Sequence, residues 1–137
     1  MIGLTPKEAE RKRVSDFLLT LRFDCSSVSP KLIEGFSLRE TRIEWLEISH
    51  FSMMEDVLLK MDREDKVPVH PHEFISEISR LDEIFDIRVC LFQREGSSKW
   101  IALVASQGKK VSQRSLVELG SGDGWATCCC FAVKPKI

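Results

Sequence analysis

The spacing of apolar residues changes once along the chain, near residue 86, and this change limits the folds open to it. Before that point, apolar residues recur every three or four positions, as on one face of an α-helix. After it the period is two, as in a strand: Ile87, Val89 and Leu91 alternate with Arg88, Cys90 and Phe92. Helices that precede strands in this way favour an α+β fold with helices packed on one face of a sheet.

The first helix is predicted over residues 6–22. Thr5 can cap it, Pro6 suits the first helical position, and Glu8 completes a Thr-x-x-Glu capping box. Apolar residues then recur at helical spacing, at Val14, Phe17, Leu18 and Leu21. Asp24 to Ser27 end this helix, and Pro30 is expected to start a short helical turn that reaches Phe36.

A long helix over residues 38–61 is the main interpretation of the next segment. Ser37 and Glu40 have the spacing of a second capping box, and apolar residues follow at intervals of three and four. The alternative is a strand over its first half, because Ile43 and Trp45 alternate with Arg42 and Glu44.

The remaining elements are a third helix and four strands. Phe74, Ile78, Leu81 and Phe85 indicate the helix, and the strands are expected over residues 87–92, 100–105, 111–119 and 125–133. Short turns between them favour an antiparallel meander. The predicted fold is therefore α+β, with three N-terminal helices followed by an antiparallel sheet of three to five strands, in a single domain over residues 1–137.

Charge and cysteine content indicate the compartment and exclude some partners. The chain has 20 Lys and Arg against 21 Asp and Glu, so there is no overall bias toward nucleic acid or membrane. No apolar run approaches the roughly 18 residues of a membrane-spanning helix. The five cysteines include consecutive Cys128, Cys129 and Cys130, which cannot form a normal disulfide framework because neighbours on a strand point to opposite faces. A reducing, cytoplasmic location is expected.

A glycine-rich segment lies near the end of the chain, with Glu118, Gly120, Gly122 and Gly124 following Ser115-Leu116-Val117. It resembles the first motif of S-adenosylmethionine-dependent methyltransferases, in which an acidic residue ends a strand and glycines precede a helix. The resemblance implies that these four residues bind the cofactor. That family also needs a helix, a second strand and an acidic ribose partner about 20 residues further on, whereas thirteen residues follow Gly124. A turn between two strands is the favoured interpretation.

Other candidates for chemistry have structural alternatives. His70 and His72, with Cys25 or Cys90, are candidate ligands for a zinc site, but their spacing is not that of known zinc ligands. His50 and the three consecutive cysteines are expected to pack in the core rather than act in catalysis. No cofactor, metal or catalytic residue is therefore predicted.

Nucleic-acid binding is a further alternative. Lys99, Lys109, Lys110 and Arg114 can gather at one end of the sheet, where Phe92 and Trp100 offer rings for stacking on bases. Interleaved acidic residues dilute the basic patch on the first helix, so a nucleic-acid partner is not favoured.

The preferred hypothesis for function is a non-enzymatic, intracellular protein-binding module, such as an adaptor, chaperone, inhibitor or regulator. On the predicted long helix, Trp45, Phe51 and Met53 fall outside the main apolar stripe, so the helix is apolar on more than one side. With Met54, these residues form the predicted surface for a protein partner or for self-association. The alternative is a helix buried on several sides in its own core.

Overall fold

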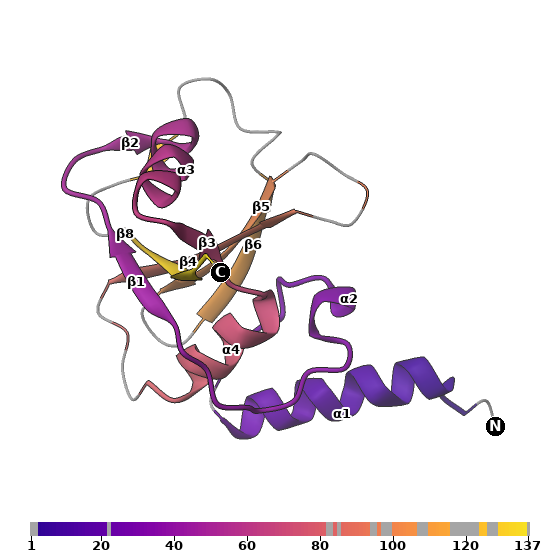
Figure 1. The fold of residues 1–137 in the computed structure, drawn as a ribbon. Coiled ribbons are helices and arrows are strands. Elements are labelled where there is room, and N and C mark those ends of the chain that lie inside the picture. The colour runs from indigo at the N-terminus through magenta and orange to yellow at the C-terminus, as the bar shows by residue number, and fades with distance from the viewer. Residues whose placement is uncertain are drawn as a thin grey trace.

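The structure is a computed structural model that describes residues 3–21, 23–81, 84, 86–93, 96, 100–106, 110–115, 124–125 and 129–136. A mixed sheet lies between α3 on one side and α1, α2 and α4 on the other (Figure 1). In the described part of the chain, no helix is long and apolar enough to cross a membrane.

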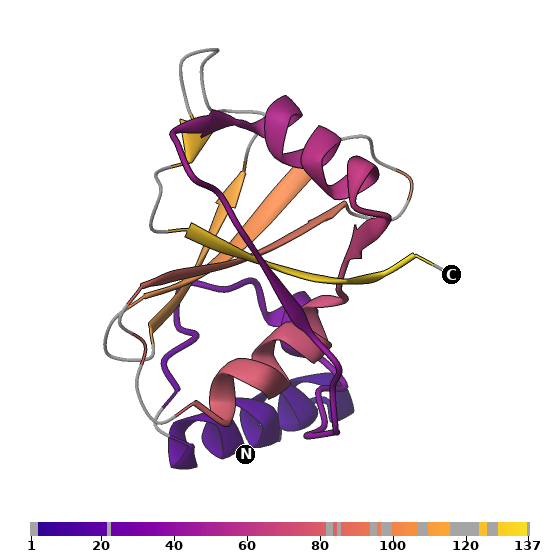
Figure 2. The ribbon, with the colours of Figure 1, turned by 60° about the vertical axis from the view of Figure 1, so that its left-hand side comes forward.

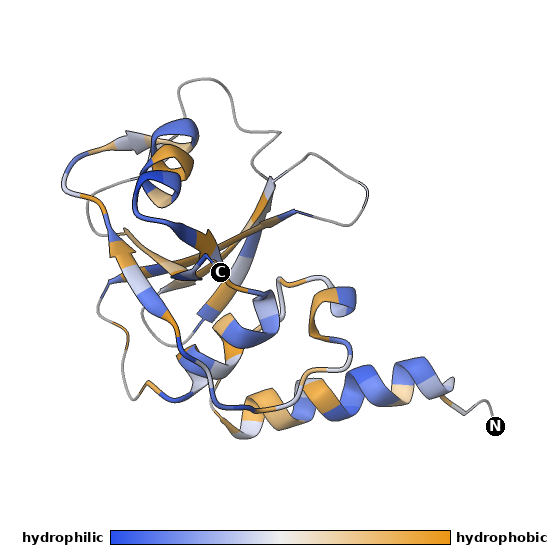
Figure 3. Ribbon diagram, viewed as in Figure 1, coloured by the Kyte–Doolittle hydropathy of each residue, from blue (hydrophilic) through white to orange (hydrophobic). Residues whose placement is uncertain are grey.

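The described helices are α1 (Pro6–Thr20), α2 (Pro30–Ile33), α3 (Met54–Arg63) and α4 (Pro71–Ser79). The predicted capping box of α1 is confirmed: the Thr5 hydroxyl accepts the Glu8 N–H, and the Glu8 carboxylate accepts the Thr5 N–H, each at 3.2 Å. Along α1 the residues change from hydrophilic to hydrophobic toward its C-terminal end (Figure 3), where Leu18 is buried.

The predicted helix over residues 38–61 is wrong in its first half. Residues 37–43 are not helical, and they lead to β1 (Glu44–Glu47), β2 (Ser52–Met53) and then α3. Leu46 and Ile48 are buried in the cluster beside α3, whereas Trp45 packs on the opposite cluster. This alternation is that of a strand, so the alternative interpretation of this segment holds.

The other strands are β3 (Lys66–Pro68), β4 (Ile87–Gln93), β5 (Trp100–Ser106), β6 (Lys110–Ser115), β7 (Gly124–Trp125) and β8 (Cys129–Pro135). In the larger sheet the order is β1-β8-β4-β5-β6, and β2 pairs with β7 separately. The meander β4-β5-β6 is antiparallel as expected. The prediction of a wholly antiparallel sheet is wrong, because β8 inserts between β1 and β4 and runs parallel to β4.

β8 is an interior strand that pairs with three others, and its two edges are used differently. Along one edge, β1 pairs antiparallel from Glu44, opposite Val133, to Glu47, opposite Cys130. Along the other edge, β4 pairs as far as Val89, opposite Phe131, and β3 takes over from Pro68, opposite Val133. Here β4 and β8 diverge, as Figure 2 shows, and we call this divergence the fork.

Helices cover both faces of the sheet, which corrects the prediction of helices on one face. On one face, residues of α1 and α4 pack with Cys90, Leu103 and Ala132. On the other, Val57 and Met61 of α3 pack with Phe131 and neighbouring strand residues. The helices also do not all precede the sheet, because β1, β2 and β3 come before α4.

Candidate functional site

An open groove of ≈ 1220 Å³ lies beside the fork, between α2, the start of α4 and the strands. Its lining combines apolar side chains with a few charged and imidazole groups. The residues are Ser29, Lys31, Leu32, Glu34, Pro68, Val69, His70, Pro71, His72, Leu91, Phe92, Gln93, Trp100 and Lys134.

His70 caps α4 at one wall of this groove. Its Nδ1 accepts the backbone N–H of His72 at 3.1 Å, and Oε1 of Glu73 accepts the N–H of His70 at 3.2 Å. The same Oε1 accepts a hydrogen bond from Nζ of Lys134 at 3.2 Å, which ties the helix cap to β8. This capping box was not predicted from the sequence, because Ser, Thr, Asp and Asn, not His, are the usual capping residues.

His72 joins α4 to α2. Its Nε2 donates to the carbonyl oxygen of Leu32 at 2.9 Å, and its ring meets the Phe36 ring edge-on at 5.8 Å. The His70 ring lies 4.9 Å away. Burial, followed by the neighbouring His70, lowers the pKa of His72 below its usual value, although the bond to Leu32 opposes this shift.

The charges along the groove are mostly basic. Glu34 is the only carboxylate among the described lining residues, and it lies 3.5 Å from Arg11 and 3.9 Å from Lys7. For Glu73, burial would raise the pKa, but the His70 N–H and Lys134 outweigh it and the pKa is lowered. Lys31 is exposed and takes part in no ion pair among the described residues.

Phe92 and Trp100 bring aromatic surface to the same groove. Phe92 lies opposite Ile101, and Trp100 lies opposite Gln93 on the neighbouring strand. Both rings belong to half-buried residues. Their shared place in one groove could not be derived from the sequence, which identified them only as candidates for stacking.

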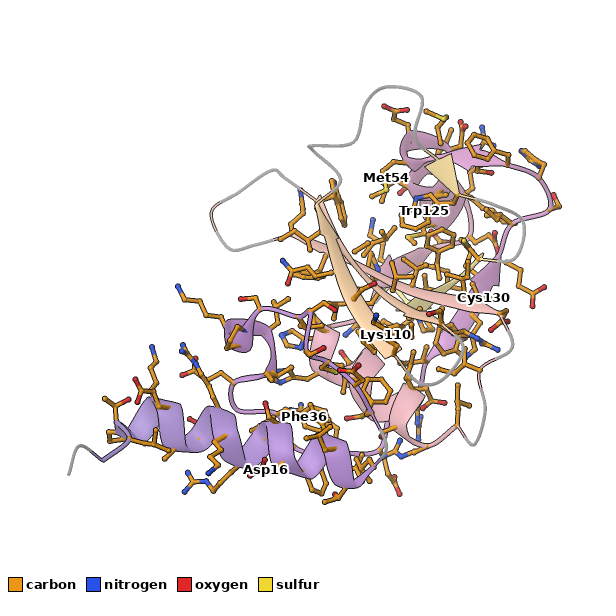
Figure 4. The ribbon with its side chains drawn as sticks, turned by 180° about the vertical axis from the view of Figure 1, so that it is seen from behind. Asp16, Phe36, Met54, Lys110, Trp125 and Cys130 are labelled. Atoms are coloured by element: carbon orange, nitrogen blue, oxygen red, sulfur yellow. The ribbon has the colours of Figure 1, made fainter. Side chains whose placement is uncertain are left out.

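The predicted partner-binding residues do not share one helix face. Trp45 lies on β1 with its ring 6.3 Å from that of Phe74. Phe51, in the loop before β2, is 58% exposed, whereas Met53 and Met54 are half-buried at the start of α3. Figure 4 shows Met54 beside Trp125 at the α3 end of the molecule. Partner binding by these residues stays a prediction.

A smaller pocket of ≈ 200 Å³ lies along α3, between its outer side and the segment before β2. Its lining includes His50, Asp56, Leu59 and Lys60. Leu59 is 47% exposed. Apolar surface is therefore present at this end of the molecule, although on a loop and a short helix rather than on one long helix.

Of the glycine-rich segment, Glu118, Gly120 and Gly122 lie outside the described residues. Gly124 lies on β7 opposite Met53, and the neighbouring Trp125 is buried with its ring perpendicular to that of Phe131 at 5.4 Å. The next described residues, Cys129–Pro135, form a strand. The methyltransferase motif instead requires a helix directly after its glycines.

The described cysteines are poor candidates for nucleophiles. Burial raises the pKa of Cys25 to about 12 and, with Asp86 adding to the effect, that of Cys130 to about 11. Burial raises the pKa of Cys90 further still. Cys129 and Cys130 are buried, as expected of a central strand, while Cys128 lies outside the described residues. Thiolates of Cys25, Cys90 and Cys130 are therefore scarce at neutral pH.

The metal and nucleic-acid candidates are not assembled into a site among the described residues. Within the described part of the chain, no three His, Cys, Asp or Glu side chains are placed to hold a metal ion. Lys110 lies opposite Ser106, at the other end of β5 from Trp100. The side chains of Lys99, Lys109 and Arg114 are not described.

Comparison of the chain with protein-family models finds no match, and comparisons with curated proteins and solved structures find none either. The function therefore has to be inferred from the chemistry of the groove and its surroundings. Its most distinctive property is that apolar and aromatic residues line it together with Lys31, Lys134 and one carboxylate, that of Glu34.

Proposed function

We propose that this protein is a non-enzymatic, intracellular binding module that holds a segment of a partner protein in the groove beside the fork. The observation that supports this best is the groove's lining. Leu32, Val69, Leu91, Phe92 and Trp100 provide apolar and aromatic surface, and the charged lining residues are Lys31, Lys134 and Glu34. Aromatic groups in a concave surface are typical centres of protein interfaces.

The size of the groove supports a macromolecular ligand over a small metabolite. Its ≈ 1220 Å³ exceeds the range of about 300–1,000 Å³ that is usual for small-molecule sites. It is also open rather than enclosed, so it would leave part of a small ligand in water. A peptide segment that continues beyond both ends fits this shape better.

The polar groups of the groove support binding rather than catalysis. His70 and His72 use ring nitrogens to cap α4 and to hold α2, and Glu73 is engaged by a backbone N–H and by Lys134. A general base needs a free lone pair within reach of a substrate proton. Nδ1 of His70 and Oε1 of Glu73 accept hydrogen bonds that hold the walls of the groove together, so these two atoms are not free for this role.

Selection of displayed peptides tests this proposal. A library of random twelve-residue peptides is selected on the wild-type protein, and enriched peptides are measured by isothermal titration. We expect dissociation constants in the micromolar range, weakened at least tenfold in Trp100→Ala, since aromatic hot spots contribute about 2 kcal/mol or more. Leu19→Ala is the matched control, because Leu19 is 62% exposed on α1 and does not line the groove.

The same titrations test the other predicted surface. Phe51→Ala alters the exposed ring before β2 and leaves the groove intact. If enriched peptides lose affinity in Phe51→Ala but not in Trp100→Ala, the binding surface lies at the α3 end and the groove proposal is wrong. If no peptide is enriched, the groove does not bind peptide segments.

A further inference from the structure

The edge of β4 that faces β8 is paired over only part of its length. From Ile87 to Val89 it pairs with β8. Further along, β8 pairs on the same side with β3 instead. Among the described residues, no strand pairs with Leu91 or Phe92 on this side, although both pair with β5 on the other. The fork therefore leaves the C-terminal part of β4 as a strand edge inside the sheet.

This edge opens into the groove. Leu91 and Phe92 of β4 line it together with Pro68, which ends β3, with Val69, which follows β3, and with Lys134 of β8. At the base of the fork, Sγ of Cys90 donates to the carbonyl oxygen of Val69 at 3.4 Å. β4 and the segment after β3 are therefore in contact at this point.

A strand edge offers backbone hydrogen bonds as well as side chains. Neighbouring residues of a strand direct their N–H and C=O groups to opposite edges. One of Leu91 and Phe92 therefore directs these groups toward the groove, while the other bonds to β5. An extended peptide satisfies such groups by adding as a strand, whereas a helix cannot.

The charges favour an acidic segment. Lys31 is exposed on α2 and lacks an ion-pair partner in the described part of the chain, whereas Lys134, which also lines the groove, is already paired with Glu73. Glu34, the carboxylate of the described lining, is already flanked by Lys7 and Arg11. A segment with carboxylates would meet cations, while a basic segment would meet like charge.

We propose that the ligand of the groove is an extended, acidic segment of a partner protein, which pairs as an additional strand with β4 at Leu91 and Phe92 and directs a carboxylate to Lys31. This inference rests on the proposed function and specifies the form and charge of the partner. About four residues of the segment, at about 3.3 Å each, span the part of β4 beyond the fork.

Backbone pairing is tested with the peptides enriched in the selection. Each peptide is resynthesised with a single N-methyl group at successive positions, which removes one N–H donor at a time. We expect alternate positions to lose affinity at least fivefold, and the groove-facing amide of Leu91 or Phe92 to exchange at least tenfold more slowly in the complex by NMR. Equal tolerance at every position, or unchanged exchange of both amides, overturns strand addition.

Charge is tested by reversal and rescue. Lys31→Glu is expected to weaken the enriched peptides at least fivefold, and a peptide with Lys in place of its acidic residue is expected to recover that loss. Lys12→Glu on α1 is the matched control, because Lys12 is exposed and does not line the groove. If reversal has the same effect at both positions, or no effect at Lys31, the acidic preference is wrong.

Other ligands give distinct outcomes. Competition by a single-stranded twelve-nucleotide DNA at equal concentration, lost in Trp100→Ala, would show a nucleic-acid groove and overturn the peptide proposal. A molecular mass that doubles with protein concentration in wild type but not in Trp100→Ala would make a second copy the occupant. Peptides that bind the groove in helical form would uphold the proposed function and overturn this inference alone.

Discussion

The guanidinium group of Arg88 lies over the indole of Trp45, with Cζ 4.5 Å from the ring centroid. Nε of Arg88 also donates to Oδ1 of Asp86 at 2.7 Å. The ring of Trp45 also meets the ring of Phe74 edge-on. Trp45 therefore connects β1, β4 and α4. This position is a structural one, in contrast with the exposed ring of Phe51.

Trp45→Ala is expected to lower the free energy of unfolding by about 2–4 kcal/mol, through lost packing and the lost cation–π contact. Phe51→Ala, at a side chain that is 58% exposed, is expected to change it by less than about 0.5 kcal/mol. Urea denaturation of both variants measures the difference. A Trp45→Ala protein as stable as wild type would mean that this indole does not join the three elements.

The stability of the α2–α4 contact is expected to fall in mild acid. The pKa of His72 is below the ordinary value of 6.5 in the folded protein, so the unfolded chain binds the proton more readily. The contribution of His72 is complete above pH 6.5 and is lost as the pH falls below it. Denaturation midpoints between pH 8 and pH 5 measure this decline.

His72→Gln is expected to remove that part of the decline, since the amide can still donate to the Leu32 carbonyl without titrating. His50→Gln is the matched control, because His50 lies near α3 and away from α2. An unchanged pH profile in His72→Gln would show that other groups cause the loss of stability.

Cys90 and Cys130 are expected to react slowly with a thiol reagent in the folded protein. Burial raises the pKa of both thiols and withholds the reactive thiolate. Site-resolved mass spectrometry after timed labelling measures each cysteine separately. Labelling of Cys130 in native buffer as fast as in urea would mean that β8 is not enclosed between its neighbours.

Ser76→Ala is expected to stabilise the protein by about 1 kcal/mol. The hydroxyl of Ser76 is fully buried on α4, and it has no hydrogen-bond partner in the described part of the chain, so removing it relieves a desolvation cost. Ser79→Ala on the same helix is the control, because the Ser79 hydroxyl donates to the Ser76 carbonyl oxygen at 2.7 Å. A destabilised Ser76→Ala protein would reveal a partner for this hydroxyl.

The parts of the fold that depend on local sequence could be predicted. The α1 cap depends on Thr5, Pro6 and Glu8, which lie within four positions, and the spacing of Phe74 and Ile78 indicates α4 because both side chains are fully buried on one side of it. The meander β4-β5-β6 joins strands that are neighbours in the sequence, so short-range turns were a sufficient guide.

The incorrect predictions all involve partners that lie far apart in the sequence. Residues 43–48 satisfy both a helical and an alternating pattern, and the strand prevails because β8 supplies hydrogen bonds to β1. No local pattern shows that β8 inserts beside β4. The groove depends on that insertion, and His70, Phe92 and Trp100 could therefore be recognised singly but not as parts of one site.

The central place of β8 also has a consequence for the order of folding. β1 and β3 find their pairing strand only in β8, which is about 80 residues after β1 in the sequence. During synthesis, both strands leave the ribosome long before their partner has been made. The larger sheet can therefore close only after β8 has been made, and until then its apolar strand residues are exposed to chaperones or to misassembly with other chains.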